Sequence, residues 1–314
     1  MGYASVMTIP VLNFSGDLKP GTERWRTLAR AVRQALEGIG CFEAVYDTVV
    51  PESLQKEMFS AMKELFELPQ ETKVKNRSEY PLRGYLVPYP RAPLYEATCI
   101  DHVDQSENVE QFTNLMWPQG NSKFSETVKT ITKKATELNK MIQVMIWESY
   151  GVEKYFNDLD TFTNYNVRMM RYKAPKGDEK MDALNVHTDK NMVTLLYQDQ
   201  VGGLELQSKD GSWIPVLPSG NSFVVMIGDV FMALSNGRLH PVTHRVMLKG
   251  REDRYSYGLF SVPTHHVIVD APEALVDEDH PKVFKPFDYT EFFNKYFLNL
   301  RNQKEYGLKE FAGI

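Results

Sequence analysis

The segment NVHTDKNMVTLLYQDQVGGLEL, residues 185–206, joins a histidine–aspartate pair to an alternating apolar run that predicts a half-buried β-strand. His187 and Asp189 are two positions apart, and side chains two apart on a strand point to the same face of the sheet. One strand can therefore present both groups to a single metal ion. The same spacing also suits a polar strand entrance without a metal, so a third ligand must be found elsewhere.

Short β-rich runs separated by turn signals dominate the chain after Gly151. The Asp-Gly pair in SKDGSW, residues 208–213, is typical of a hairpin turn. The runs are NYNVRMMRY (164–172), MVTLLYQ (192–198), GLELQS (203–208), SWIPVL (212–217), SFVVMIG (222–228), VTHRVML (242–248) and RYSYGLFSV (254–262). Many short strands with such turns favour a sandwich, jelly roll or barrel.

Helical periodicity dominates the N-terminal half. Residues 22–40 carry apolar side chains at helical spacing, a second helix is expected after Pro51, and residues 122–151 carry the longest helical pattern. Between them, residues 76–118 break into prolines, tyrosines and turns, which predicts a functional loop region. A helical pattern returns only at DYTEFFNKYFLNL, residues 288–300. We expect an α-rich half wrapped on an all-β core.

Composition excludes several classes of partner. The 314 residues are 42% hydrophobic, and the net charge of -5 with scattered basic residues argues against nucleic acid or an anionic membrane as partner. Only Cys41 and Cys99 are present, which favours a reducing compartment, by default the cytoplasm. We identify no targeting pattern and no apolar run of about 18 residues, the length of a membrane helix. A small-molecule partner is expected.

A third ligand candidate lies in PVTHRVML, residues 241–248. Of the other histidines in the β-rich half, only His244 falls within a predicted strand of the same core. With His187 and Asp189 it completes a two-histidine, one-carboxylate set, which binds non-haem Fe(II) and leaves three coordination positions open. Zinc stays an alternative, because the number of ligands alone does not separate the two metals.

The open coordination positions of the metal suit a co-substrate that chelates it. An anionic co-substrate also needs a cationic side chain to bind the end that lies away from the metal. Arg254 and Ser256 alternate onto one strand face after His244, and together they offer a guanidinium fork and a hydroxyl for a carboxylate. Tyr172, in RMMRYKAP at 168–175, can add a phenolic donor.

These motifs resemble those of the plant Fe(II)- and 2-oxoglutarate-dependent dioxygenases. The likeness rests on HTD at 187–189, GDVFMALSNGRLHPVTHRV at 228–246 and RYS at 254–256, and it extends from IPVLNF at 9–14 to DEDHPKVFKPFDYTEFF at 277–293. Within that family the chain looks most like the specialised-metabolism clade that includes deoxypodophyllotoxin synthase and the glucosinolate alkenyl- and hydroxyalkyl-producing enzymes.

The resemblance implies an α+β protein with a double-stranded β-helix, or jelly-roll, core. Residues 1–150 would form an α-rich cap region, residues 151–270 the core, and residues 271–314 a C-terminal helical segment. O2 and a small-molecule substrate would be the other reactants, with ascorbate as the expected reductant and a monomer as the expected state.

The resemblance also assigns roles to individual residues. His187, Asp189 and His244 become the Fe(II) ligands, while Arg254 and Ser256 bind the distal carboxylate of 2-oxoglutarate with help from Tyr172. The expected substrate-pocket residues are Arg168, Phe260, Tyr85, Phe112 and Met116.

The chain departs from the family pattern near the co-substrate. Met170 stands where relatives usually carry asparagine, and Lys173 stands where they usually carry proline. The first departure affects a hydrogen bond near 2-oxoglutarate, and the second affects the loop that leads to His187.

Two other functions stay open. An oxidase of the ethylene-forming type would use the same ligands without consuming 2-oxoglutarate, and a non-catalytic small-molecule binding protein could keep the β-core without chemistry. Within the dioxygenase family, the motifs do not decide between hydroxylation, desaturation, ring closure and demethylation.

Overall fold

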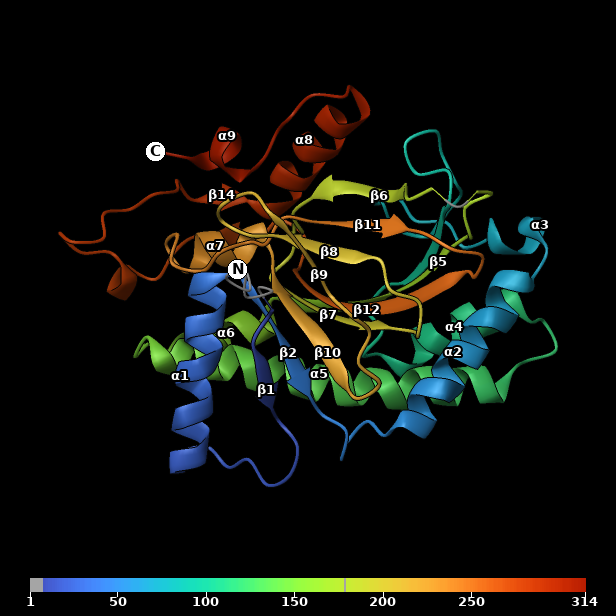
Figure 1. Cartoon of the computed structure of the whole chain (residues 1–314). Helices are drawn as coiled ribbons and strands as arrows, with labels where there is room; N and C mark the ends of the chain where they lie inside the picture. Colours follow the sequence, from blue (N-terminus) through green and yellow to red (C-terminus); the bar gives the residue numbers. More distant parts are fainter. Residues whose placement is uncertain (1–7, 178) are drawn as a thin grey trace, which may run out of the picture.

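Two β-sheets face each other at the centre of the computed structural model, which describes residues 8–177 and 179–314, and helices surround them (Figure 1). The major sheet has eight strands in the order β1-β2-β10-β7-β12-β5-β4-β3, and the minor sheet has four in the order β6-β11-β8-β9. The α+β class with a jelly-roll core is therefore confirmed.

The elements have the following bounds. The major sheet contains β1 (Val11–Asn13), β2 (Cys41–Val45), β3 (Tyr85–Leu86), β4 (Tyr95–Ile100), β5 (Thr163–Tyr172), β7 (Val193–Gln198), β10 (Ser222–Ile227) and β12 (Arg254–Pro263). The minor sheet contains β6 (Met181–His187), β8 (Leu204–Gln207), β9 (Trp213–Pro215) and β11 (His244–Leu248), and β13 (Ile268–Val269) pairs with β14 (Phe287–Asp288). The helices are α1 (Glu23–Gly38), α2 (Glu52–Glu67), α3 (Gln70–Lys73), α4 (Ser106–Met116), α5 (Ser122–Ser149), α6 (Lys154–Thr161), α7 (Asp229–Leu234), α8 (Tyr289–Arg301) and α9 (Leu308–Ala312), with a 3-10 turn at Glu273–Leu275.

Strand β5 shows how the alternating sequence separates two cores. Tyr165, Val167 and Met169 belong to the core between the major sheet and the helices. Met170 and Tyr172 belong to a second core, between the two sheets. Because successive side chains of a strand point to opposite faces, one strand can serve both cores. The side chains expected to bind the co-substrate thereby face the space between the sheets.

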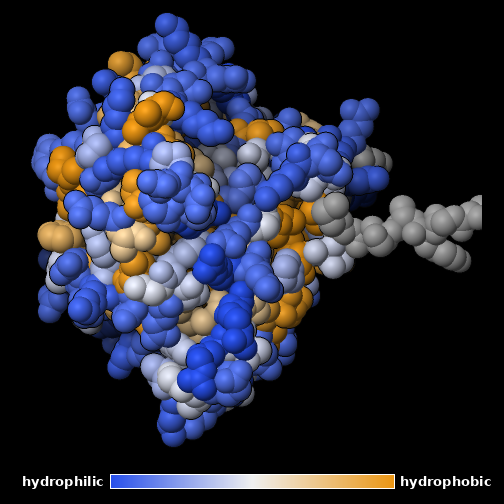
Figure 2. All heavy atoms as spheres, turned by 90° about the vertical axis from the view of Figure 1, so that its left-hand side faces the viewer, coloured by the Kyte–Doolittle hydropathy of each residue, from blue (hydrophilic) through white to orange (hydrophobic). Residues whose placement is uncertain are grey.

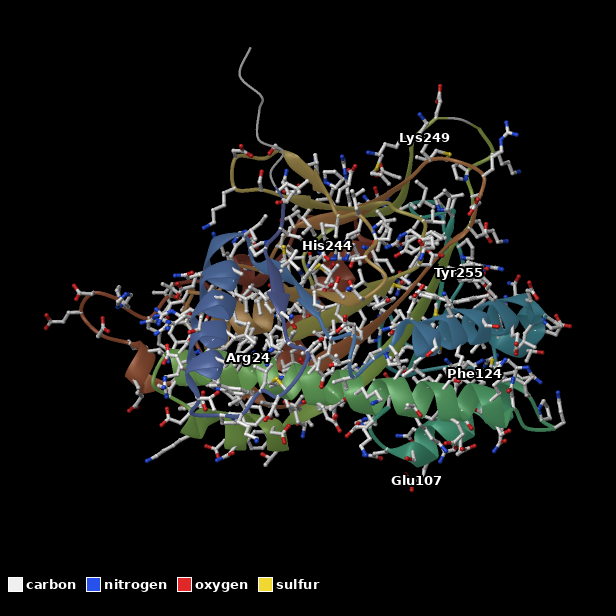
Figure 3. All side chains as sticks on the ribbon, turned by 60° about the horizontal axis from the view of Figure 1, so that its bottom comes forward. Arg24, Glu107, Phe124, His244, Lys249 and Tyr255 are labelled. Carbon is white, nitrogen blue, oxygen red and sulfur yellow. The ribbon has the colours of Figure 1, made fainter. Side chains whose placement is uncertain are left out.

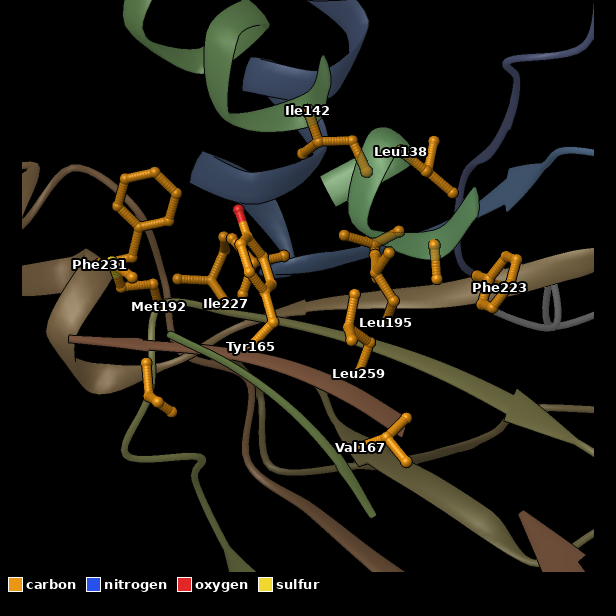
Figure 4. Close-up of a cluster of buried hydrophobic side chains, with 14 of the residues drawn as sticks. Leu138, Ile142, Tyr165, Val167, Met192, Leu195, Phe223, Ile227, Phe231 and Leu259 are labelled. Carbon is orange, nitrogen blue, oxygen red and sulfur yellow. The ribbon is translucent and has the colours of Figure 1, made fainter. Parts of the chain in front are cut away.

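Helix α5 supports the major sheet from the side opposite to the minor sheet. Figure 4 shows Leu138 and Ile142 of this helix packed toward Leu195 and Leu259 of the sheet, all four of them fully or almost fully buried. Its 28 residues correspond to about 42 Å of helix, enough to run across several strands. The helix thus gives the major sheet a rigid backing.

The N-terminal region contributes strands as well as helices. Residues 76–118, expected to be a loop region, contain β3, β4 and α4, so this expectation was wrong for much of the segment. The strand pattern of β4 is obscured by Glu96, a charged residue that is only 2% exposed. Its carboxylate pairs with Lys73 at 2.6 Å and with Arg171, and such pairing offsets the cost of burying a charge.

The hairpin expected at the Asp-Gly pair is present between β8 and β9. Gly211 has φ of +85°, a conformation that glycine adopts without strain, and the amide of Ser208 donates to the carbonyl of Ser212 at 2.9 Å. This turn fixes the register of the outer half of the minor sheet.

The C-terminal segment lies against one end of the two sheets, where α8 and α9 are drawn in red in Figure 1. The side chain of Asp288 accepts a hydrogen bond from the amide of Glu291 and so caps α8. On the face in Figure 2, hydrophilic residues surround separate hydrophobic patches. Among the described residues, no helix has the length and hydropathy needed to cross a membrane.

Candidate active site

Neighbouring strands of the minor sheet bring the two histidines of the candidate metal site together. His187 is the last residue of β6, His244 is the first residue of β11, and the two are direct partners in the antiparallel register. Their ring centroids are 4.2 Å apart. In Figure 3, His244 is labelled near the centre of the molecule, in the region of the two sheets. Asp189 lies in the loop after β6, so the expectation that one strand presents both His187 and Asp189 was wrong.

The three side chains converge with their metal-binding atoms free. The Nε2 atoms of His187 and His244 lie 3.8 and 3.9 Å from Oδ1 of Asp189, and the candidate ligand atoms all lie within 4.8 Å of one another. Nδ1 of His187 is 2.7 Å from the carbonyl of Asn185, and Nδ1 of His244 is 3.1 Å from that of Val242. Both contacts favour a proton on Nδ1, so the Nε2 lone pairs are available to a metal.

Electrostatics favours the same binding-competent state. Burial, together with the neighbouring His244, lowers the pKa of His187 below its ordinary value. Burial alone would raise the pKa of Asp189, but the two histidines and a hydrogen bond from Thr194, at 2.5 Å, lower it overall. Near neutral pH the site therefore holds a neutral imidazole and a carboxylate. This donor set fits Fe(II), which binds two histidines and one carboxylate on one face.

The candidate co-substrate anchor is completely buried. Arg254 and Ser256 are both 0% exposed, and Nη1 of Arg254 donates to Oγ of Ser256 at 3.1 Å. Nη2 donates to Gln198 at 2.7 Å, while Nε has no hydrogen-bond partner among the described residues. Within that part of the chain, Arg254 forms no ion pair with a carboxylate. A buried guanidinium so placed is suited to an anionic ligand.

Sheet register brings Tyr172 and Met170 to the same anchor. On β12 and β5, Arg254 is paired with Tyr172 and Ser256 with Met170. The Arg254 guanidinium carbon lies 5.0 Å from the centre of the Tyr172 ring. Burial raises the pKa of Tyr172 above its ordinary value, so its hydroxyl stays protonated and can donate. In this structure it contacts the sulfur of Met170 at 3.6 Å.

The two departures from the family pattern have different structural consequences. Met170 faces Ser256 across the strand pair, so a thioether, which cannot donate a hydrogen bond, stands beside the anchor. Lys173 donates its backbone N–H to the carbonyl of Leu94 at 2.8 Å. Proline has no such donor, so here the loop gains a hydrogen bond instead of a rigid ring.

Comparison with known proteins finds one matching family model in each half of the chain. Residues 158–263 match the family model of the 2OG-Fe(II) oxygenase superfamily, and residues 9–92 match that of the non-haem dioxygenase in morphine synthesis N-terminal region. The chain is 45% identical over 293 residues to the probable 2-oxoglutarate-dependent dioxygenase AOP1.2 of Arabidopsis thaliana, covering 91% of this chain and 90% of that protein. The chain belongs to the Fe(II)- and 2-oxoglutarate-dependent dioxygenases.

Further relatives support the same assignment. The 2-oxoglutarate-dependent dioxygenase AOP2 of Arabidopsis thaliana is 30% identical over 434 aligned residues, covering 100% of this chain and 99% of that protein. Among solved structures, the dioxygenase for auxin oxidation in rice superposes with a TM-score of 0.82 at 30% identity, covering 98% of this chain and 100% of that one. The family expected from the motifs, and its double-stranded β-helix, are confirmed.

A cavity of about 670 Å³ opens beside the metal ligands of this dioxygenase. Arg168, Phe260 and Tyr85, three of the expected pocket residues, line it together with His187 and Asp189. The segment 81–91 and helix α8 supply much of the remaining wall. We call these two elements the cavity wall, and we call His187, Asp189, His244, Arg254 and Ser256 the catalytic floor.

Phe112 and Met116 do not line the cavity. Both belong to α4 and are buried in the core between the major sheet and the helices, where the Phe112 ring lies 5.8 Å from that of Phe124. Their apolar side chains serve helix packing, so the expectation that they form part of a substrate wall was wrong.

Sequence reasoning missed the part that α8 and Lys190 play in this dioxygenase. Tyr289, Phe293 and Tyr296 of α8 line the cavity, and their spacing of three or four residues is the available signal. Nζ of Lys190 bonds the carbonyl of Thr188 at 2.9 Å and the carboxylate of Asp229 at 2.8 Å. It also lies 4.6 Å from the centre of the Tyr296 ring. Lys190 thus links the metal-binding loop to both α7 and α8.

Proposed function

We propose that this dioxygenase oxidises a small plant specialised metabolite, with conversion of 2-oxoglutarate and O2 to succinate and CO2. One observation carries the proposal: His187 and Asp189 of the His187–Asp189–His244 set line a cavity of about 670 Å³, a size typical of small-molecule sites. The auxin-oxidising activity named for the rice relative is a precedent for a small plant metabolite as substrate.

The catalytic floor supplies positioning and charge. His187, Asp189 and His244 hold Fe(II), and Fe(II) bound with 2-oxoglutarate supplies the O2 activation that allows a carbon–hydrogen bond to be oxidised. Arg254 and Ser256 bind the distal carboxylate of the co-substrate through charge-assisted hydrogen bonds. These contacts orient the co-substrate and keep its far end fixed.

Tyr172 adds a donor beside the anchor, and the cavity wall excludes water from the reacting centre. Arg168, Phe260 and Tyr85 contribute to substrate selection, because all three line the cavity next to the metal ligands. Exclusion of water protects the reactive centre from side reactions. Hydroxylation, desaturation, ring closure and demethylation are all compatible with this arrangement.

We further propose that the enzyme is a cytoplasmic monomer that uses ascorbate to keep its iron reduced. Both cysteines are buried free thiols, which suits a reducing compartment. Burial raises the pKa of Cys99 to about 12, so that thiol stays protonated and inert to oxidation.

The test is to supply the purified protein with Fe(II), ascorbate, 2-oxoglutarate and a panel of plant phenolics, alkaloids, lignans and terpenoids. We expect succinate formation coupled to a mass change in one class of compound. Product formation without succinate would favour an oxidase of the ethylene-forming type. Metal binding with neither product nor succinate would favour the non-catalytic binder.

A further inference from the structure

The charges around the substrate cavity are strongly one-sided. Asp189 is the only acidic residue among the described residues that line it. The basic residues that line it are Arg83, Arg91, Arg168, Lys190 and Arg301. A cavity with this imbalance attracts anions more than neutral molecules or cations.

Four of the five basic side chains have an evident partner or are exposed. Arg83 lies 3.3 Å from Asp101, and Lys190 pairs with Asp229 at 2.8 Å. Arg91 and Arg301 are exposed to solvent, where water stabilises their charge. Only the charge of Arg168 therefore needs a further explanation.

Arg168 is half-buried in the cavity and forms no ion pair with a carboxylate within the described residues. Its Nη2 donates to the backbone carbonyl of Leu82 at 2.5 Å, and its guanidinium carbon lies 5.4 Å from the centre of the Phe260 ring. A carbonyl and an aromatic ring orient the guanidinium, but neither neutralises its charge. The Tyr95 hydroxyl is a further neutral hydrogen-bonding neighbour of the guanidinium, which has five N–H groups in all and so can also bind a ligand.

A loaded catalytic floor would not neutralise this charge either. Fe(II), the Asp189 carboxylate, doubly ionised 2-oxoglutarate and the Arg254 guanidinium together carry no net charge. The positive charge of Arg168 then remains without a counter-ion beside a neutral reacting centre. An anionic group on the substrate would supply that counter-ion.

Strand register places this guanidinium close to the site of reaction. Arg168 is directly opposite Gly258 on β12, which is two positions from Ser256 of the anchor. A Cβ atom on Gly258 would lie 2.8 Å from Cε2 of Phe260, so the missing side chain leaves room for that ring. Gly258 and Phe260 thus form the platform on which the Arg168 guanidinium lies.

We propose that the substrate carries an oxyanion group, a carboxylate or a sulfate ester, which binds Arg168 while its apolar part packs against Phe260 and α8. This inference rests on the proposed function and adds the chemical class of the substrate to it. Arg168 then serves as a specificity-determining residue, since it selects anionic molecules over their neutral counterparts. The bond to be oxidised lies on the part of the molecule that faces the metal ligands.

The experiment is affinity selection in the absence of O2. Protein loaded with Fe(II) and 2-oxoglutarate is mixed with an equimolar library of plant aromatic carboxylic acids, phenolic sulfate esters, and the methyl ester or free phenol of each. The bound fraction is separated by gel filtration and identified by mass spectrometry. We expect acids or sulfates to be retained about tenfold or more over their neutral counterparts, as for a charge-assisted hydrogen bond.

Variants separate the effect of Arg168 from the general attraction of anions to the positively charged cavity. Arg168→Gln should lose the preference for anions, and Arg168→Lys should keep part of it. The control Arg77→Gln removes an exposed charge that does not line the cavity and should keep the preference. Circular dichroism checks that each variant is folded.

Retention of neutral compounds as strongly as anionic ones, retention of no anionic compound, or an undiminished preference in Arg168→Gln would each overturn the proposal. Enrichment of acids alone or of sulfates alone identifies the group. Succinate formation by the wild-type protein is measured separately. If it is absent, the proposed function fails whatever the library shows, whereas succinate without anion selectivity leaves the function standing and removes only the substrate class.

Discussion

The catalytic floor and the cavity wall of this dioxygenase are built in different ways. The floor is built on paired strands, where His187 faces His244 and neighbouring strands hold Arg254 and Ser256 in register. The wall comes from α8, which belongs to neither of the two large sheets, and from the segment 81–91, which joins the major sheet only through the two-residue edge strand β3. Backbone hydrogen bonds therefore set the geometry of the floor, while side-chain packing sets that of the wall. The comparison predicts that changes in the floor stop the reaction and that changes in the wall redirect it.

The largest effect is expected from removal of a metal ligand. His187→Ala and His244→Ala should each reduce succinate formation to below detection and prevent retention of Fe(II), because two protein ligands remain of three. Succinate assays and metal analysis after gel filtration measure the two effects. His280→Ala, which removes an exposed histidine paired with Asp277, is the control. Appreciable turnover in either ligand variant would refute the assignment of the floor.

Replacement of the co-substrate anchor should have a smaller effect of a different kind. Arg254→Lys keeps the charge but loses the planar fork, which costs about 1–3 kcal/mol in a buried site. We expect the KM for 2-oxoglutarate to rise about tenfold or more, with a much smaller change in the KM for the organic substrate. Steady-state kinetics with each substrate varied in turn measures the difference. An unchanged KM for 2-oxoglutarate would indicate another anchor or chemistry of the ethylene-forming type.

A third substitution tests the connection between floor and wall. Lys190→Met leaves the buried carboxylate of Asp229 without its partner, and breaking a buried pair costs about 3 kcal/mol or more. We expect a lower Tm in thermal unfolding, together with weaker Fe(II) binding, since Lys190 also holds the carbonyl of Thr188. Lys190→Arg keeps the charge and should recover most of the stability. Unchanged stability in the methionine variant would show that the link between the metal-binding loop and the helices is unimportant.

The smallest effect is expected at Gly258. In Gly258→Ala the new methyl group would lie 2.8 Å from Cε2 of Phe260, so the ring, which lies 5.4 Å from the Arg168 guanidinium carbon, must shift. We expect a change of a few-fold in the relative kcat/KM of competing substrates, with little change in Tm. Competition assays with two substrates of different size measure it. A variant that loses Fe(II) binding instead would place Gly258 in the floor and weaken the distinction between the two regions.

Sequence alone predicted the metal-ligand set of the floor, while the co-substrate role of Arg254 and Ser256 stays a prediction. The two-residue spacing of Arg254 and Ser256 places both on one face of β12, whereas Asp189 lies in the loop after β6. The structure still brings His187, Asp189 and His244 together as expected. The sequence did not predict which strands pair with which. A jelly-roll core nevertheless limits the strand ends that can lie next to one another. The spacing of side chains along the chain and the fold class were together sufficient to predict the metal ligands.

The wall could not be predicted in the same way, because its residues meet through long-range packing. Tyr296 of α8 and Lys190 are far apart in the sequence, and nothing local to either indicates the other. The prolines and turns around Phe112 and Met116 predict a loop that reaches the wall, but the two residues lie in α4 and pack in the core with the other helices. Strand β4 was also not predicted. Its buried Glu96 interrupts the apolar pattern, and the charge of Glu96 is neutralised by Lys73 and Arg171, which lie outside the strand.

Tyr289 and Phe292 of helix α8 are buried in the core between the major sheet and the helices. The helix is also held at two further points. Its start is capped by Asp288 at the end of the two-stranded sheet, and its Tyr296 ring lies over Lys190. Phe297 and Leu300 line the cavity but do not belong to that core, so they can be exchanged without rebuilding it. Chimeras that carry residues 289–301 from a related dioxygenase, with Tyr289, Phe292 and Tyr296 retained, should keep the same reaction and accept different molecules. The cavity-lining face of one helix is thus a place where the choice of substrate can change while the fold stays the same.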